Sequence, residues 1–435
     1  MSVPSGGGAE STSATAMTHR IMVDEKNEPE FSAIGIVSHE LAHQWWGDLI
    51  TLRSWAHTWL NESFATYSDY LYFRHDRGDD EGAVNLNDKL NAYLREAKTR
   101  YVRPIVTDRY DQPGDMFDSH TYPKGALVLH MLRQQLGDAA FFDTLKHFLH
   151  RYAFEPVDTG DFIRSVKTVT GQNLDWFFDQ WLFKPGHPVF NVKSEWDPAR
   201  KVLVLKVAQV QDFTRGIPVF RVPVSVAVVN AAGRSTSRVW IREREETFEF
   251  PSETRPLLVR FDPDNVLLKE VAFTKQRDEL LYQLSHDDVI GRMSAAAGLA
   301  SLKDDQVAIA GLAAGAQRDT FWAVRRAAIE ALARAGGAGN PALMKKAALD
   351  AHPSVRAAAL VALGDLKDRS LLEFFKERFA KDGSDAVRAE SLRAIGKLGD
   401  PSTLPFLEQC AAVPSYRHLI AAAAKQAIVA AGARQ

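Results

Sequence analysis

The sequence predicts a mainly α-helical, multidomain chain with a helical first part, a small β-sandwich and a C-terminal α-solenoid. Its 435 residues exceed what one hydrophobic core usually serves. Helical spacing of apolar residues gives way first to alternating apolar and polar residues, and then to a repeat of roughly thirty residues. We therefore expect three domains, at residues 1–190, 191–275 and 276–435.

The first part is expected to be helical because aromatic and aliphatic residues recur at helical spacing. Examples are TWLNESFATYSDYLYFR, which begins at Thr58, and LDWFFDQWLF, which begins at Leu174. Asp158 or Thr159 is well placed to cap the helix that contains FIRSVKTVTG. Four tryptophans are expected to fill the core of this part: Trp45, Trp46, Trp55 and Trp59.

The second part alternates apolar and polar residues, as half-buried strands do. The segments KVLVLKVAQVQ, FRVPVSVAVVN and RVWIREREETFEF follow this pattern, and NAAGR supplies a turn between two of them. About six short strands ending near Ala272 predict a small β-sandwich.

The third part repeats one pattern of small and aliphatic residues around an arginine. Such repeats build solenoids in which each unit buries its apolar face against its neighbours. They resemble HEAT repeats, and IAAAAKQAIVAAG near the end is similar to a capping copy without the arginine. A protein partner is a possible occupant of such a surface. The aligned arginines are Arg292, Arg325, Arg356 and Arg388.

The composition excludes several other classes of protein. A formal net charge of −2 gives no sign of nucleic-acid or membrane-surface binding. The longest apolar run, from Leu419 to Ala431, is too short to span a bilayer and contains Lys425. Cys410 is the only cysteine, and the first residues lack the pattern of a signal peptide. We therefore expect no membrane span and a cytoplasmic location, unless a signal peptide lies upstream.

Two histidines four residues apart point to a metal ion. His39 and His43 would lie one turn apart on a single helical face, and Glu40 would reach a metal-bound water. A catalytic zinc needs a third protein ligand, and Glu62 is well placed on the following helix. The alternative is an ordinary solvated helix on which this pattern occurs by chance.

The wider motif resembles the aminopeptidase N and leukotriene hydrolase family of zinc metallopeptidases. HELAHQWWGD is followed by WLNESFATY, with eighteen residues between His43 and Glu62. The resemblance implies a thermolysin-like helical catalytic domain and one zinc ion held by His39, His43 and Glu62, with Glu40 as the general base. Ser63 departs from the family, which usually has a glycine after the third ligand.

Two further segments extend the resemblance. In this family a glycine-rich segment binds the substrate backbone and its free amine. The family also has a catalytic tyrosine, which precedes an x-Lys-Gly sequence. TYPKGA places Tyr122 at that position, although an ordinary helix start is the alternative for this residue. The glycine-rich segment, which could instead be disordered, consists here of Gly7, Gly8, Ala9 and Glu10, with alanine in place of the family's methionine.

The chain departs most from the family at its N-terminus. The family has a large β-rich domain before the glycine-rich segment, whereas few residues precede it here. We therefore expect either a fragment or a second chain that supplies the missing domain.

The resemblance implies a zinc-dependent aminopeptidase that hydrolyses the N-terminal peptide bond of peptides. Zinc would activate a water molecule, Glu40 would accept its proton, Tyr122 would stabilise the oxyanion and Glu10 would hold the amine. Two alternatives stay open. The chain could be a catalytically impaired fragment that binds protein partners through its repeats, or an endopeptidase or epoxide hydrolase on the same zinc site. His57 and His120 are expected to be surface or packing residues rather than ligands.

Overall fold

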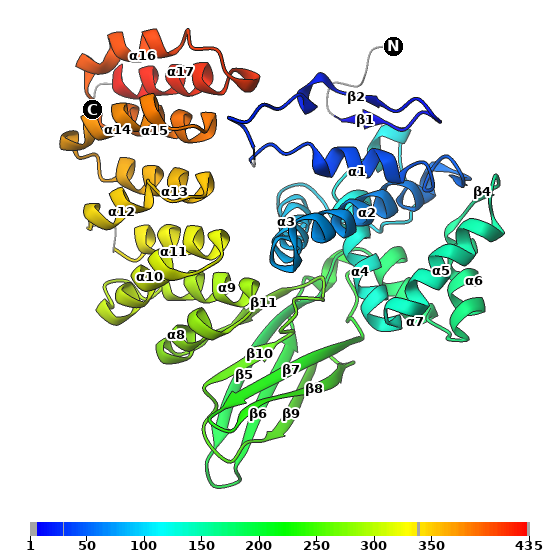
Figure 1. Ribbon diagram of the computed structural model, residues 1–435. Coiled ribbons are helices and arrows are strands. Elements are labelled where there is room, and N and C mark those ends of the chain that lie inside the picture. Colours follow the sequence, from blue (N-terminus) through cyan, green and yellow to red (C-terminus); the bar gives the residue numbers. More distant parts are fainter. Residues whose placement is uncertain (1–6, 29, 337–339, 433–435) are drawn as a thin grey trace. The chain divides into compact units, whose positions relative to one another are not determined.

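The computed structural model describes residues 7–28, 30–336 and 340–432, and the chain forms two compact units. One unit comprises Thr18 and the residues before it together with Ile34–Thr274. The other comprises His19–Ala33 and the chain from Lys275 onward. The first unit thus carries the helical part and the β-sandwich, and the second carries the repeats (Figure 1).

Amphipathic helices around an aromatic core form the helical part. A capping box starts one of them, because the Asp158 carboxylate accepts from the Asp161 N–H at 3.1 Å and Asp161 reciprocates at 2.9 Å. Phe162 packs edge-on against Phe64 in the core. The helices are α1 (Ile34–Ala42), α2 (Trp59–Arg77), α3 (Asp79–Thr99), α4 (Gly125–Leu136), α5 (Asp138–Arg151), α6 (Thr159–Thr170) and α7 (Asp175–Phe178).

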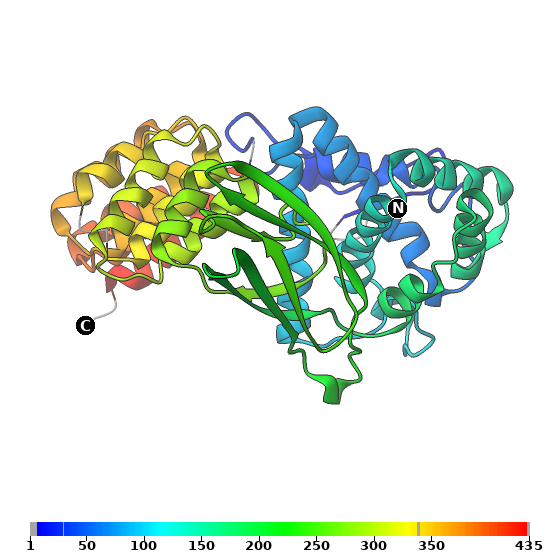
Figure 2. The ribbon, with the colours of Figure 1, turned by 90° about the horizontal axis from the view of Figure 1, so that it is seen from below.

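Two sheets make the β-sandwich, whose strands are visible from below in Figure 2. One sheet has the order β11-β5-β6-β9 and the other β10-β7-β8; all neighbours are antiparallel except β11 and β5. Alternation buries Phe190 and Val192 and exposes Asn191 between them. The strands are β5 (Val189–Asp197), β6 (Val202–Gln209), β7 (Val222–Asn230), β8 (Gly233–Ile241), β9 (Glu245–Pro251), β10 (Leu258–Phe261) and β11 (Glu270–Phe273).

The apolar core continues from the helices into the sandwich. The rings of Trp181 and Phe220 lie 4.8 Å apart, and the Gln180 side chain donates to the Arg221 carbonyl at 2.9 Å. The sandwich therefore supports the helical part as one unit.

Paired helices build the second unit, as the repeat pattern predicted. The second helix of each pair packs on the second helix of the next pair. Small residues permit this close approach, because a Cβ on Gly396 would lie only 2.5 Å from the Ala427 Cα. None of the helices among the described residues is long and apolar enough to cross a bilayer. The helices are α8 (Arg277–His286), α9 (Val289–Leu299), α10 (Gln306–Arg318), α11 (Trp322–Arg334), α12 (Pro341–Ala347), α13 (Pro353–Asp365), α14 (Leu372–Lys381), α15 (Asp385–Lys397), α16 (Leu404–Cys410) and α17 (Leu419–Gly432).

The aligned arginines join successive repeats. Arg325 makes two hydrogen bonds to Asp350, at 2.8 and 2.7 Å. The same two-pronged pairing links Arg292 with Asp319 and Arg356 with Asp382. We call these three pairs the arginine ladder. Arg388 ends it, because it binds Asp385 on its own helix and the Phe379 carbonyl.

A segment from the start of the chain belongs to the repeat unit. We call His19–Ala33 the strap. The Lys26 carbonyl accepts from the N–H of Asp385 at 2.9 Å, at the start of α15, and the Glu30 carboxylate accepts from the Ser384 hydroxyl at 2.7 Å. The Tyr416 hydroxyl donates to a strap carbonyl, that of Arg20.

Candidate metal centre and active site

One cleft in the first unit contains every site residue that the sequence predicted. Its volume is about 1590 Å³. Helices α1 and α2 form part of its wall, and the two-residue strand β1 (Gly8–Ala9), paired with β2 (Ala16–Met17), forms another part. The predicted residues in its lining are Gly7, Gly8, Ala9, Glu10, His39, Glu40, His43, Glu62 and Tyr122.

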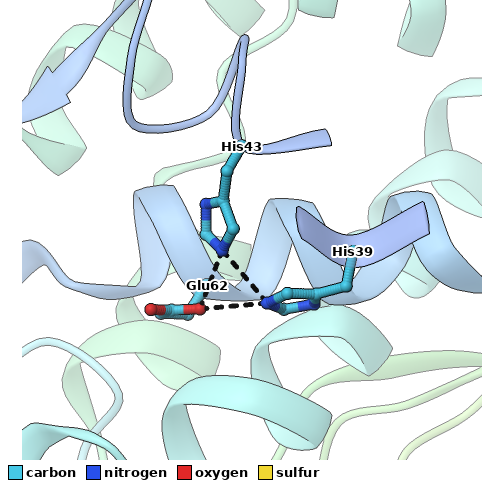
Figure 3. A group of neighbouring side chains, drawn as sticks. All are labelled: His39, His43 and Glu62. Carbon is cyan, nitrogen blue, oxygen red and sulfur yellow. Dashed lines mark hydrogen bonds and ion pairs between the residues drawn. The ribbon is translucent and has the colours of Figure 1, made fainter. Parts of the chain in front are cut away.

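Three side chains converge in this cleft (Figure 3). Nε2 of His39 and Nε2 of His43 lie 3.0 Å apart, and each lies 3.2 Å from Oε2 of Glu62. His39 comes from α1, and His43 continues the same helical turn, because its N–H donates to the His39 carbonyl at 3.3 Å. Glu62 lies in the first turn of α2, where the helix dipole favours a carboxylate.

These three atoms fit a zinc ion. Ligand atoms on a tetrahedral zinc with bonds of about 2.0–2.1 Å are separated by roughly 3.3 Å. Two imidazoles and one carboxylate are also a donor set that catalytic zinc uses. Burial lowers the pKa of His43, but hydrogen bonding to Glu62 outweighs it and raises the pKa to about 9. A metal must therefore displace a proton from His43 when it binds.

The backbone fixes the orientation of the His43 ring. The Trp46 carbonyl accepts a hydrogen bond from Nδ1 at 2.8 Å, which leaves Nε2 on the side of Glu62, where it can bind a metal once its proton is displaced. The next residue, Gly47, has a φ of +143°, which other residues rarely adopt, and a Cβ there would lie 3.1 Å from Nδ2 of Asn61. On the other ring, Nδ1 of His39 lies 3.9 Å from the Asp69 carboxylate.

Two more carboxylates lie beside the histidines. Carboxylate oxygens of Glu10 and Glu40 and a ring nitrogen of His43 lie within 4.8 Å of one another. Burial raises the pKa of Glu40; His39 and His43 oppose the rise, and the charges of Glu10 and Glu62 add to it. Among the described residues, Oε2 of Glu40 has no hydrogen-bond partner. The cleft thus holds a free proton acceptor next to the three converging side chains.

Tyr122 lies on a short π-helical turn, His120–Lys124, that leads into α4. Its ring stacks at 24° to the His39 ring, with centroids 6.0 Å apart. Burial raises the pKa of Tyr122, and the nearby Glu62 carboxylate raises it further. The hydroxyl therefore keeps its proton at neutral pH and can donate it in a hydrogen bond.

Other predicted residues lie elsewhere or differ from expectation. Trp46 and Trp59 are buried, but the core role expected of Trp45 and Trp55 is wrong, because these side chains are 47% and 41% exposed. Trp55 lines the cleft instead, 6.0 Å from the Phe117 ring. Both lie between the end of α1 and the start of α2, and Trp55 begins a short 3-10 helix, Trp55–His57.

The two other histidines lie outside the group of three. His57 contacts the Thr159 hydroxyl at 3.0 Å. His120 is fully buried and stacks on Tyr101, and its Nδ1 lies 3.3 Å from Asp118, which Arg103 also binds. Potential ligand atoms of His120, Asp118 and Glu96 also lie within 4.8 Å of one another, so the packing role expected of His120 stays a prediction.

Comparisons with known proteins agree with this architecture. Residues 2–181 match the peptidase family M1 domain, and residues 340–428 match the HEAT repeats. A probable aminopeptidase 1 of Sulfurisphaera tokodaii is 32% identical over 183 residues, which cover 41% of this chain and 23% of that protein. Aminopeptidase N of Lactococcus lactis is 35% identical over 164 residues, which cover 36% and 19%. The matched region thus spans about a fifth of these relatives' length.

A solved structure confirms the fold class. The crystal structure of Legionella pneumophila aminopeptidase A in complex with aspartic acid has a TM-score of 0.74 and covers 98% of this chain and 60% of its own. Its sequence is 15% identical, so the likeness concerns the fold alone. The match of residues 2–181 to the peptidase family M1 domain confirms the family resemblance that the motifs predicted.

Proposed function

With a peptidase family M1 domain in residues 2–181 as the premise, we propose that the chain acts as a zinc-dependent aminopeptidase on peptides. The observation that carries the proposal is the convergence of His39, His43 and Glu62, whose ligand atoms lie 3.0–3.2 Å apart. The names of the relatives, which are aminopeptidases, also support it.

His39, His43 and Glu62 would hold the zinc ion. Bound there, zinc supplies an activated water and an electrophile for the carbonyl oxygen of the scissile bond. The carboxylate of Glu40 accepts the proton of the attacking water and later gives it to the leaving amine. Its free Oε2 and its position beside His43 support this role.

Tyr122 stabilises the negative charge that develops on the carbonyl oxygen. Its hydroxyl stays protonated, as its raised pKa indicates, and it lies in the same cleft as the ligands. Such a donor acts most strongly where water is largely excluded.

Glu10 selects substrates with a free N-terminus. Its carboxylate and that of Glu40 lie within 4.8 Å of His43 and of each other, so their combined charge favours an ammonium group nearby. An ion pair between Glu10 and the substrate's amine would place only the first peptide bond at the reacting groups. Gly7, Gly8 and Ala9 lead into Glu10 and line the cleft beside the substrate backbone.

Substrates that differ only at their N-terminus test this proposal. Aminoacyl-coumarin amides and their N-acetylated forms are incubated with the protein, with and without a chelator and added zinc. We expect cleavage of the free amines alone, lost on chelation and restored by zinc. Glu40→Gln should retain zinc and lose turnover, whereas Glu155→Gln, at an exposed glutamate, should match the wild type.

The alternative outcomes separate the competing functions. Equal cleavage of the blocked substrates would favour an endopeptidase. A complete lack of zinc-dependent turnover would favour a scaffold that binds partners through its repeats.

A further inference from the structure

A buried serine connects the helix of the third proposed ligand to the turn that carries Tyr122. Ser63 follows Glu62 on α2, and its side chain is 0% exposed. Its hydroxyl donates to the Thr121 carbonyl at 2.5 Å. This short contact joins two elements that are 58 residues apart in the sequence.

The hydrogen bond completes the anchoring of one peptide group. The carbonyl of Thr121 and the N–H of Tyr122 belong to the same peptide plane. Ser63 holds the carbonyl end, and the N–H end donates to the Asp118 carbonyl at 3.0 Å. The plane from which the Tyr122 side chain projects is therefore held at both ends.

The rest of the turn is fixed independently of Ser63. The Asp118 carboxylate accepts from the N–H of Thr121 at 3.0 Å, and Arg103 binds both that carboxylate and the Thr121 hydroxyl. Removing the Ser63 hydroxyl should therefore release one carbonyl without unfolding the turn.

The two elements pack closely where Gly125 faces Ser63. A Cβ placed on Gly125, the first residue of α4, would lie 1.9 Å from the Ser63 Oγ. The hydroxyl thus occupies space that the missing side chain of Gly125 leaves free, and a larger residue at position 125 would clash with it.

We propose that Ser63 is a positioning residue that sets Tyr122 relative to the metal centre. It acts through the Thr121 carbonyl and does not touch the substrate. The proposal rests on the proposed function, because it concerns where the Tyr122 hydroxyl stands when the oxyanion forms. The related family usually has glycine here, so this link is a feature of the present chain.

A double-mutant cycle tests the proposal in the intact 435-residue chain. Ser63→Ala should lower kcat roughly 10- to 100-fold, the size expected for a misplaced catalytic group, with little change in KM or zinc content. In a Tyr122→Phe background the same change should have almost no further effect, because the positioned hydroxyl is already absent. Ser63→Gly should behave like Ser63→Ala.

A matched control lies on the same helix. The Ser68 hydroxyl donates to the carbonyl of Phe64, one turn back on its own helix, at 2.8 Å, so Ser68→Ala removes a serine hydroxyl that joins no second element. It should leave kcat unchanged. A wild-type kcat in Ser63→Ala, a full independent loss in the Tyr122→Phe background, or loss of zinc would overturn the proposal.

A second measurement does not depend on activity. Amide hydrogen exchange of the peptide that contains Thr121 and Tyr122 should speed up in Ser63→Ala and stay unchanged in Ser68→Ala. If the wild type hydrolyses nothing, the proposed function fails, and this exchange still decides whether Ser63 anchors the turn. Unchanged exchange in Ser63→Ala would contradict the anchoring.

Discussion

Gly8 leaves the space that the Glu40 carboxylate occupies. A Cβ on Gly8 would lie 2.2 Å from the Cδ of Glu40 and 2.3 Å from its Oε1. Gly8 therefore matters for its missing side chain as well as for its backbone. By contrast, a Cβ placed on the neighbouring Gly7 would have no atom within 4 Å.

This contrast yields a prediction for two adjacent glycines. Gly8→Ala should lower kcat roughly 10- to 100-fold, because the new methyl group displaces the Glu40 carboxylate from the attacking water. Gly7→Ala should have little effect. Steady-state kinetics and zinc analysis of both variants provide the check, and equal kinetics for the two would contradict this role of Gly8.

The sequence predicted which residues line the cleft but little of what orients them. His39, His43 and Glu62 could be predicted because helical spacing and motif distance restrict where such residues can lie. The contacts of Ser63 with Thr121 and of Gly8 with Glu40 join segments brought together only by folding. No local pattern carries that information, so Ser63 could be noted only as a departure from the family motif.

At the scale of whole elements, the arginine ladder links successive repeats. The sequence predicted the aligned arginines from their recurrence, but it did not predict their aspartate partners, which lie 25 to 27 residues further on. Each pair joins one repeat to the next and is largely shielded from water; the Arg325 and Asp350 side chains are only 13% and 14% exposed.

Removing one charge of the ladder should destabilise the solenoid. Asp350→Asn keeps the acceptor that caps the N–H of His352 but loses the carboxylate that binds Arg325. We expect a loss of about 1.5–3 kcal/mol at pH 7, the usual range for hydrogen bonds to charged groups. Thermal unfolding measures this loss of stability. The control is Asp365→Asn, because Asp365 forms an exposed ion pair with Lys397.

The same variant should lose its effect in acid. Burial raises the pKa of Asp350, but the hydrogen bond from Arg325 outweighs it, and the pKa lies below its ordinary value of 3.8. A carboxylate whose pKa is lowered by folding stabilises the fold when the pH is above its unfolded-state pKa. This stabilisation is lost as the pH falls through the folded-state pKa. The difference between wild type and Asp350→Asn should therefore shrink below about pH 4. A constant difference would assign the effect to packing.

At the scale of the whole molecule, a segment of the repeat unit precedes helix α1, which carries His39, in the sequence. It leaves the first unit after Thr18, forms the strap, and returns at Ile34 to begin α1. The sequence predicted the helical part, the β-sandwich and the helical repeats, because each follows from a local pattern of apolar residues. It did not predict the strap, whose contact between Glu30 and Ser384 joins residues 354 positions apart.

The strap should be protected from proteolysis by its contacts with the repeats. Tyr416 holds it with a hydrogen bond to the Arg20 carbonyl and with ring contact to Phe31 at 5.3 Å. Tyr416→Ala should therefore speed tryptic cleavage after Arg20 and Lys26, as mass spectrometry of the fragments would detect. The control variant Tyr72→Ala, which changes an exposed tyrosine of α2, should be cleaved by trypsin at the wild-type rate. Equal rates in all three proteins would mean that the strap is not held at Tyr416.

The central claim is that two imidazoles and one carboxylate bind a single zinc ion, and metal analysis after dialysis tests it most directly. The wild type should retain one zinc ion per chain. Glu62→Ala should lose most of it, because two histidines alone are an incomplete ligand set, while Glu155→Ala should retain it. Full zinc retention by Glu62→Ala, or a wild type that binds no zinc, would contradict the account.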